Sequence, residues 1–130
     1  MKRPPAVGDT FTLVRQCDQY RPIYYAAASG DFNPIHIDAA AGARAGLGGA
    51  ILQGLCTLGW AVDCFIQYLG NPVALKRMSV RFSKPVAVED TITFTGRVIA
   101  IENGLLKAHI EAKNQRGEDV LTGAMLEGAR

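Results

Sequence analysis

The sequence predicts an α+β fold in which an antiparallel β-sheet wraps around one long α-helix. Two patterns support this class. An apolar run over residues 49–69 suits a buried central helix, and from residue 74 onward the apolar residues repeat with a period of two, which is typical of strands with one buried face. With 130 residues, 48% hydrophobic and 20% charged, the chain is expected to form a single globular domain over residues 1–130.

The segment before the apolar run is predicted to hold one strand and one helix. Residues 10–15 alternate between apolar and polar types and predict the strand. Asp18 is a good N-cap for a helix that reaches Ser29, because Pro22 falls near its first turn and Gly30 can end it.

The apolar run itself is predicted to be a buried helix of a soluble domain and not a membrane span. Residues 49–69 are about as long as a span, but they include Gln53, Asp63 and Gln67. A polar group at the centre of a bilayer costs several kcal/mol. We therefore expect this helix to be the core element and expect no membrane association.

The second half of the chain is predicted to be β-structure. Met78, Val80 and Phe82 alternate with polar residues in a strand that Pro85 closes. An Asn-Gly pair at 103–104 predicts a tight hairpin. The other strands are predicted at residues 91–101, 105–114 and 119–127. Wrapped around a central helix, such a sheet is a hot-dog arrangement, and its exposed edges predict a dimer.

Charge and cysteine content favour a cytoplasmic protein that binds no nucleic acid. The net charge of +2 comes from residues scattered along the chain, apart from a basic cluster over residues 76–84 that we expect to be a solvated strand face. Cys17, Cys56 and Cys64 are odd in number and lack metal-binding spacing, which predicts reduced thiols. The first nine residues lack the apolar stretch of a secretory signal, so no export is expected.

Residues 30–48 are rich in Gly, Ala and Asp and predict an ordered loop with one short helical piece over residues 39–44. Its polar side chains have a purely structural explanation. Asp31 or Asn33 can form an Asx-turn, and Asp38 can cap the short helix.

The motif GDFNPIHID at the start of this loop also has a chemical interpretation. Pro34 stiffens the loop, so that the Asp31 carboxylate and the His36 imidazole can converge on one water molecule, as acid–base catalysis requires. The loop leads through several glycines to Gly54 and the first turns of the apolar helix, where free backbone N–H groups are donors for a developing oxyanion.

The stretch YAAASGDFNPIHID resembles the signature of the MaoC-like (R)-specific enoyl-CoA hydratases and 3-hydroxyacyl dehydratases. A second stretch, RFSKPVAVEDTITFTGRV, resembles another pattern of that family, so the resemblance covers nearly the whole chain. It implies a hot-dog fold, a homodimer, and a trans-2-enoyl thioester of coenzyme A or acyl carrier protein as substrate. It implies neither a metal nor another cofactor.

The resemblance also assigns roles to individual residues. Asp31 and His36 match the catalytic pair, Asn33 matches a position that orients the pair, and the Gly54 amide matches the donor that polarises the thioester carbonyl. His36 is then the base towards water, while Asp31 holds the same water and passes the proton to C2.

Two departures from the family pattern leave other functions open. Gln53 stands where a histidine is common, which affects substrate choice or carbonyl alignment, and Ala39 stands where a proline is common, which affects only a helix cap. The alternatives are an acyl-CoA-binding or structural subunit of a hetero-oligomer and, less favoured, an acyl-CoA thioesterase.

A minor alternative for the basic cluster is contact with coenzyme A phosphates, through Lys76, Arg77, Arg81 and Lys84.

The remaining notable side chains are expected to be structural. His109 alternates with apolar neighbours and predicts an ordinary exposed residue. Asp63 is expected at the exposed edge of its helix. Trp60, Phe65 and Tyr68 are expected in the core, where one of them could close the end of an acyl tunnel.

Overall fold

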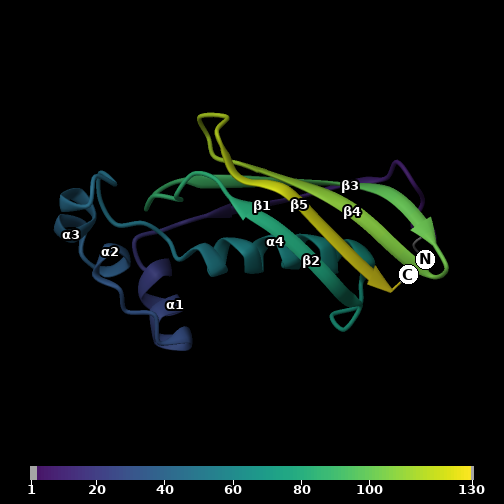
Figure 1. The fold of residues 1–130 in the computed structure, drawn as a ribbon, viewed down its shortest axis with the longest axis horizontal. Coiled ribbons are helices and arrows are strands. Elements are labelled where there is room, and N and C mark those ends of the chain that lie inside the picture. Colours follow the sequence, from purple (N-terminus) through teal and green to yellow (C-terminus); the bar gives the residue numbers. More distant parts are fainter. Residues whose placement is uncertain (1–2, 130) are drawn as a thin grey trace.

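The computed structural model describes residues 3–129, which form one antiparallel sheet curved around a long helix (Figure 1). The sheet has the order β1-β3-β4-β5-β2, which leaves β1 and β2 at its two edges. The predicted α+β hot-dog arrangement is therefore confirmed. The strands are β1 (Thr10–Gln16), β2 (Leu75–Phe82), β3 (Thr91–Glu102), β4 (Leu105–Lys113) and β5 (Asp119–Ala129).

The central helix α4 (Gly54–Leu69) begins later than the apolar run that predicts it. Residues 49–53 are not helical, because their backbone pairs with the segment before β3: Ile51 forms a bridge with Ala87, and the Leu52 amide donates to the Val86 carbonyl at 2.8 Å. This pairing places the first free amides of α4 at one end of the sheet.

The core lies between α4 and the concave face of the sheet. Phe65 of α4 is fully buried, and the Trp60 ring packs edge-on against Phe94 of β3 with centroids 6.4 Å apart. The core placement predicted for these two helix residues is confirmed. Tyr68 is only partly buried and stacks on Phe11 of β1 at 4.3 Å. No helix within residues 3–129 is long and apolar enough to cross a bilayer.

Three short helices lie beyond the end of the sheet where α4 begins (Figure 1). They are α1 (Arg21–Ser29), α2 (Pro34–Ile37) and α3 (Ala39–Arg44). The predicted short piece over residues 39–44 is confirmed, whereas α2 lies in a segment for which only a loop was predicted. Its four residues are too few for a helical period to be visible in the sequence.

The predicted N-cap of the first helix is wrong. Tyr20 is the N-cap of α1, and Asp18 lies in the preceding turn. Its carboxylate still binds the entry to the helix, because Oδ1 accepts from the amides of Tyr20 and Arg21 at 2.9 Å each. The helix begins later than predicted because this turn comes before it. Asp18 still accepts hydrogen bonds from free amides near the helix start, as an aspartate at the N-cap would.

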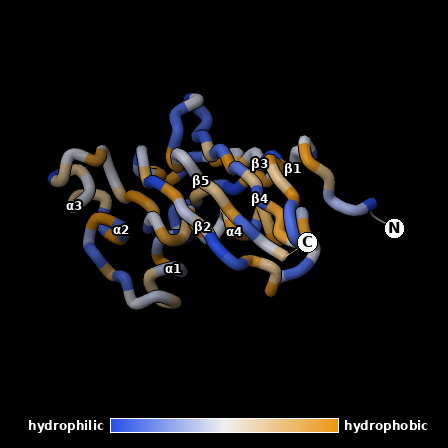
Figure 2. The backbone as a smooth tube through the Cα atoms, turned by 45° about the vertical axis from the view of Figure 1, so that its right-hand side comes forward, coloured by the Kyte–Doolittle hydropathy of each residue, from blue (hydrophilic) through white to orange (hydrophobic). Residues whose placement is uncertain are grey.

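A buried carboxylate connects the hydrophilic turn between β4 and β5 (Figure 2) to the segment before β3. Asp90 is 3% exposed, and its Oδ1 accepts from Gln115 Nε2 at 2.8 Å and from Arg116 Nη1 at 3.2 Å. Its Oδ2 accepts from the Ala87 amide at 3.0 Å. Burial acts to raise the pKa of Asp90, but the hydrogen bonds from these three residues outweigh it and leave the pKa lowered.

We expect Asp90→Ala to lower the free energy of unfolding at pH 7 by about 2–3 kcal/mol, because buried donors lose their acceptor. A lowered pKa means that the carboxylate stabilises the fold fully above its unfolded pKa, and that this contribution is lost as the pH falls through the folded pKa. Urea unfolding of both proteins at pH 7 and pH 3 tests this. The difference between them should shrink at pH 3, and an equal difference at both pH values would contradict the account.

Candidate active site

The structure brings together the two residues that the sequence predicts as the acid–base pair. Asp31 follows Gly30, the C-cap of α1, and His36 lies within α2. The two side chains meet with His36 Nε2 3.6 Å from Asp31 Oδ2. The imidazole is 10% exposed and the carboxylate 47% exposed, so the pair lies at the surface with its histidine largely covered.

The loop between the two residues is held by short-range hydrogen bonds. The Asn33 amide donates to Asp31 Oδ1 at 3.3 Å, which is the expected Asx-turn. Asn33 in turn N-caps α2, because its Oδ1 accepts from the Ile35 amide at 3.2 Å. Turn formation and a candidate catalytic pair therefore coexist in this motif, and Asn33 contacts the start of the helix that carries His36.

A backbone carbonyl determines which nitrogen of the imidazole is free. His36 Nδ1 lies 2.8 Å from the carbonyl oxygen of Ile51. Because a carbonyl only accepts, Nδ1 carries the hydrogen, and in the neutral ring Nε2 has the free lone pair. That lone pair is on the nitrogen next to the Asp31 carboxylate, so two acceptors lie beside one another.

The predicted oxyanion donor, Gly54, lies on the same pocket as His36. The pocket has a volume of about 220 Å³. Gly54 is the first residue of α4, and within residues 3–129 nothing accepts a hydrogen bond from its amide. The positive end of the helix dipole adds to this donor. Besides His36 and Gly54, the lining comprises Ile51, Leu52, Thr57, Phe82, Ser83, Lys84, Pro85, Val86 and Val120.

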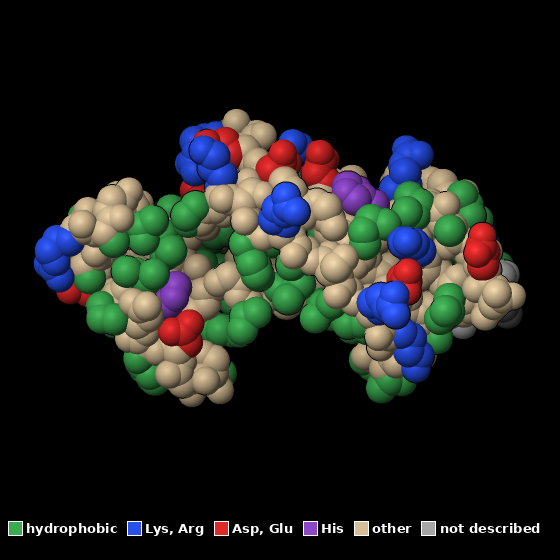
Figure 3. Space-filling view, in the orientation of Figure 1, with side chains coloured by type: hydrophobic (Ala, Val, Ile, Leu, Met, Phe, Trp, Pro, Cys, Tyr) green, Lys and Arg blue, Asp and Glu red, His purple; other side chains and the backbone are tan. Residues whose placement is uncertain are grey.

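The approach to Gly54 is narrow. A Cβ atom at this position would lie 3.2 Å from Cε1 of Phe82, whose side chain is 51% exposed. Asp31 does not line the pocket and reaches it through its contact with His36. Figure 3 shows a hollow along the lower edge of the molecule with hydrophobic side chains on its walls.

Sequence reasoning missed several members of this pocket. The Ile51 carbonyl orients His36, but every residue has a backbone carbonyl, so the sequence cannot indicate which one accepts this hydrogen bond. Phe82 appears in the sequence only as one residue of an alternating strand. Thr57 lies one turn after Gly54 on an otherwise apolar, buried helix face, and that single polar position is the signal that could have indicated it.

The other predicted side chains lie outside the pocket or have structural partners. Asp63 is half-exposed, as expected, and its Oδ2 accepts from Arg15 Nη2 at 3.1 Å. His109 is exposed on β4, as expected. Lys84 lines the pocket and forms an ion pair with Glu118 at 3.4 Å. Within residues 3–129 no cluster of His, Cys, Asp and Glu could hold a metal ion.

The three cysteines are free and buried. Burial raises the pKa of Cys17 to about 12 and that of Cys64 to about 11, and it also raises the pKa of Cys56. All three remain thiols near neutral pH. A nucleophilic cysteine requires a lowered pKa, so these residues are structural.

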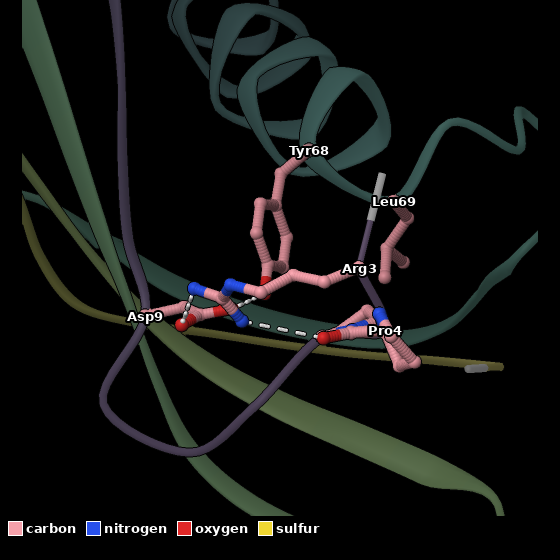
Figure 4. A pocket seen from close by; sticks show the side chains of 6 residues that line it. Arg3, Pro4, Asp9, Tyr68 and Leu69 are labelled. Carbon is pink, nitrogen blue, oxygen red and sulfur yellow. Dashed lines mark hydrogen bonds and ion pairs between the residues drawn. The ribbon is translucent and has the colours of Figure 1, made fainter. Parts of the chain in front are cut away.

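A second pocket of about 490 Å³, at the other end of α4, has polar groups that are already paired (Figure 4). Arg3 Nη2 donates to Asp9 Oδ1 at 2.6 Å, and the Tyr68 hydroxyl donates to Asp9 Oδ2 at 2.6 Å. Burial and the Asp9 hydrogen bond raise the pKa of Tyr68 to about 12. These groups are paired with each other, so the smaller pocket beside His36 is the candidate active site.

The chain is similar to known proteins of one family. Residues 8–119 match the family model described as MaoC like domain. The chain is 36% identical to the peroxisomal multifunctional enzyme type 2 of Drosophila melanogaster over 97% of its own length and 20% of that protein. It is also 36% identical to the peroxisomal enoyl-CoA hydratase 2 of Arabidopsis thaliana, over 94% of this chain and 37% of that one. The chain thus spans a fifth to somewhat more than a third of these relatives.

Solved structures show the same fold. A chain of the ChsH1-ChsH2 complex from Mycobacterium tuberculosis superposes with a TM-score of 0.88 at 26% identity, covering 95% of this chain and 97% of that one. The (R)-hydratase from A. caviae involved in PHA biosynthesis superposes with a TM-score of 0.89 at 23% identity, over 99% and 100% of the two chains. The family match and these superpositions lead to one conclusion: the chain belongs to the MaoC-like dehydratase family and has its hot-dog fold.

Proposed function

We propose that this chain is an (R)-specific hydratase that adds water reversibly across the trans-2 double bond of an enoyl thioester. The proposal rests on one arrangement. His36 and Asp31 form the candidate acid–base pair, and the pocket beside His36 also contains the free amide of Gly54 at the start of α4. The relatives named enoyl-CoA hydratase support this reaction class, and coenzyme A or acyl carrier protein is the proposed carrier.

In the proposed mechanism one water molecule donates its two hydrogens to His36 Nε2 and Asp31 Oδ2. These acceptors are 3.6 Å apart, which is too long for a good direct hydrogen bond and suits a shared donor. His36 takes a proton as the water oxygen bonds to C3. That proton passes to Asp31 and then to C2, so water is added without a net change in either residue.

The negative charge that develops on the thioester oxygen needs a donor already in place. The Gly54 amide supplies it, because its N–H has no acceptor within the described residues and lies at the positive end of the helix dipole. Most residues that line the pocket are apolar, and surroundings of low polarity strengthen an interaction with this charge.

A graded series of trans-2-enoyl-CoA esters tests the proposal. The purified chain should remove the enoyl absorbance of at least one chain length and release no free thiol, because hydration leaves the thioester intact. Free thiol release with the acyl chain unchanged would indicate a thioesterase instead. Inertness towards every ester on both carriers, by the chain alone and in its oligomeric form, would exclude the hydratase.

We propose a homodimer in the cytoplasm as the working form of the protein. Edge strand β2 supports the dimer, because both of its faces are exposed and Met78 and Phe82 on it are 42% and 51% exposed. The three free thiols support a reducing compartment. Sedimentation of the purified chain tests the dimer, and a monomer at micromolar concentration would contradict it.

A second candidate is a subunit of a hetero-oligomeric dehydratase. Two relatives favour it: the ChsH1-ChsH2 complex and the beta subunit of 3-oxo-4,17-pregnadiene-20-carboxyl-CoA hydratase, to which this chain is 26% identical over 73% of its length. This candidate predicts that the chain alone is inert and gains hydratase activity when purified with a second hot-dog chain.

A further inference from the structure

We infer that Gln53 is a positioning residue that holds the Asp31 backbone and the Gly54 amide in one rigid unit. The inference rests on the proposed function, because its role is to align the acid–base pair with the oxyanion donor. Its evidence is the set of contacts that the Gln53 side chain makes in this chain.

The Gln53 side chain spans the space between two segments that are distant in sequence. Its Nε2 donates to the Pro22 carbonyl of α1 at 2.9 Å and lies 3.4 Å from the Asp31 carbonyl. An amide nitrogen has two hydrogens, so both carbonyls can be bound at once. The side chain is 1% exposed, and these hydrogen bonds are therefore shielded from water.

The backbone of Gln53 connects the same side chain to the oxyanion donor. Gln53 is the N-cap of α4, and its carbonyl accepts from the Cys56 amide at 3.0 Å. The next residue is Gly54. Two residues earlier, the Ile51 carbonyl orients His36. The 51–54 segment thus includes the Gly54 amide, contacts the His36 imidazole and, through the Gln53 side chain, contacts the Asp31 backbone.

Packing alone does not account for this amide. Gln53 Oε1 is buried and has no hydrogen-bond partner within the described residues, which costs stability that an apolar side chain would not lose. The two carbonyls fix the orientation of the amide, since turning it over would place oxygen against oxygen. An amide is also neutral at every pH, so this link stays constant while the acid–base pair exchanges protons.

The test compares Gln53→Met with Gln67→Met, the same change at an exposed position of α4, the helix that Gln53 caps. Methionine keeps the length of the side chain and removes the donor. We expect Gln53→Met to lower kcat for enoyl-CoA hydration by about 10- to 100-fold, with KM changed less than about threefold, because misalignment affects the transition state more than binding. Gln67→Met should stay within about twofold of wild type.

A second readout needs no turnover. The ring nitrogen resonances of His36 report the adjacent carboxylate, and His109 is an internal reference on β4. We expect Gln53→Met to move the His36 resonances in the direction that Asp31→Asn moves them and to leave those of His109 in place. If methionine prevents folding, Gln53→His, which keeps a donor, takes its place and should move the His36 resonances less than Asp31→Asn does.

The two readouts separate the two hypotheses. If wild type does not hydrate enoyl esters but the His36 resonances move as expected, the proposed function fails and the positioning role stands. If a folded Gln53→Met protein keeps the wild-type His36 resonances and the wild-type kcat, the positioning role is wrong whatever the reaction.

Discussion

His36→Gln and Asp31→Asn are each expected to lower kcat for crotonyl-CoA hydration by about 100- to 10,000-fold, the usual contribution of a well-placed acid or base. The glutamine keeps a hydrogen-bonding group at His36 but removes the base, and the asparagine keeps the shape of Asp31 but cannot carry the proton. In the proposed mechanism His36 Nε2 and Asp31 Oδ2, which lie 3.6 Å apart, handle the same proton. The double variant should therefore lose little more activity than the worse single one.

Asp38→Asn is the matched control for Asp31→Asn. Asp38 lies in the same motif and caps α3 by accepting from the Ala40 amide at 2.9 Å, a role that asparagine also performs. His109→Gln is the control for His36→Gln. Both controls should retain at least about half of the wild-type kcat. An Asp31→Asn or His36→Gln protein that is folded and keeps more than a tenth of wild-type kcat would remove that residue from the mechanism.

Gly54→Pro tests the oxyanion donor, with Gly54→Ala as its control. Proline removes the N–H and fits the first turn of a helix. Gln53, with φ −61° and ψ 132°, already has the extended geometry that a residue before proline adopts. We expect Gly54→Pro to have a kcat about 100- to 1,000-fold below that of Gly54→Ala, the usual loss for one oxyanion-hole donor.

The alanine variant accounts for the added bulk. Its Cβ would lie 3.2 Å from the Phe82 ring, and proline adds the same atom, so the comparison removes the effect of Cβ and leaves the loss of the N–H together with the two further ring carbons of proline. Equal kcat values for the two folded proteins would show that the Gly54 amide is not the donor. Steady-state hydration kinetics give the kcat of both variants, and thermal unfolding shows whether both are folded.

The fold was largely predictable because hydrophobic periodicity reports burial directly. The alternation of β3, β4 and β5 and the apolar face of α4 are both confirmed by the observed burial. What the pattern could not predict was where α4 begins, since residues 49–53 are as apolar as the helix. Their backbone pairs with the segment before β3, a contact between residues distant in sequence that periodicity does not report.

The site was predictable in the residues of the motif and in Gly54, which lies on the same pocket as His36. Asp31 and His36 stand out by residue type and lie together as expected, while their chemical roles stay predictions. Two further groups that contact them could not be predicted in this way. The Ile51 carbonyl is a backbone atom, and Gln53 is recognisable in sequence only as a departure from a pattern, although it is almost fully buried against the Asp31 backbone.

The most direct measurement is the product that purified wild-type chain forms from crotonyl-CoA, resolved by chiral chromatography. The account predicts (R)-3-hydroxybutyryl-CoA as the dominant product, with its formation lost in Asp31→Asn and kept in Asp38→Asn. Formation of the (S) product, or formation of the (R) product at the same rate by Asp31→Asn, would contradict the assignment of the Asp31–His36 pair as the hydration site.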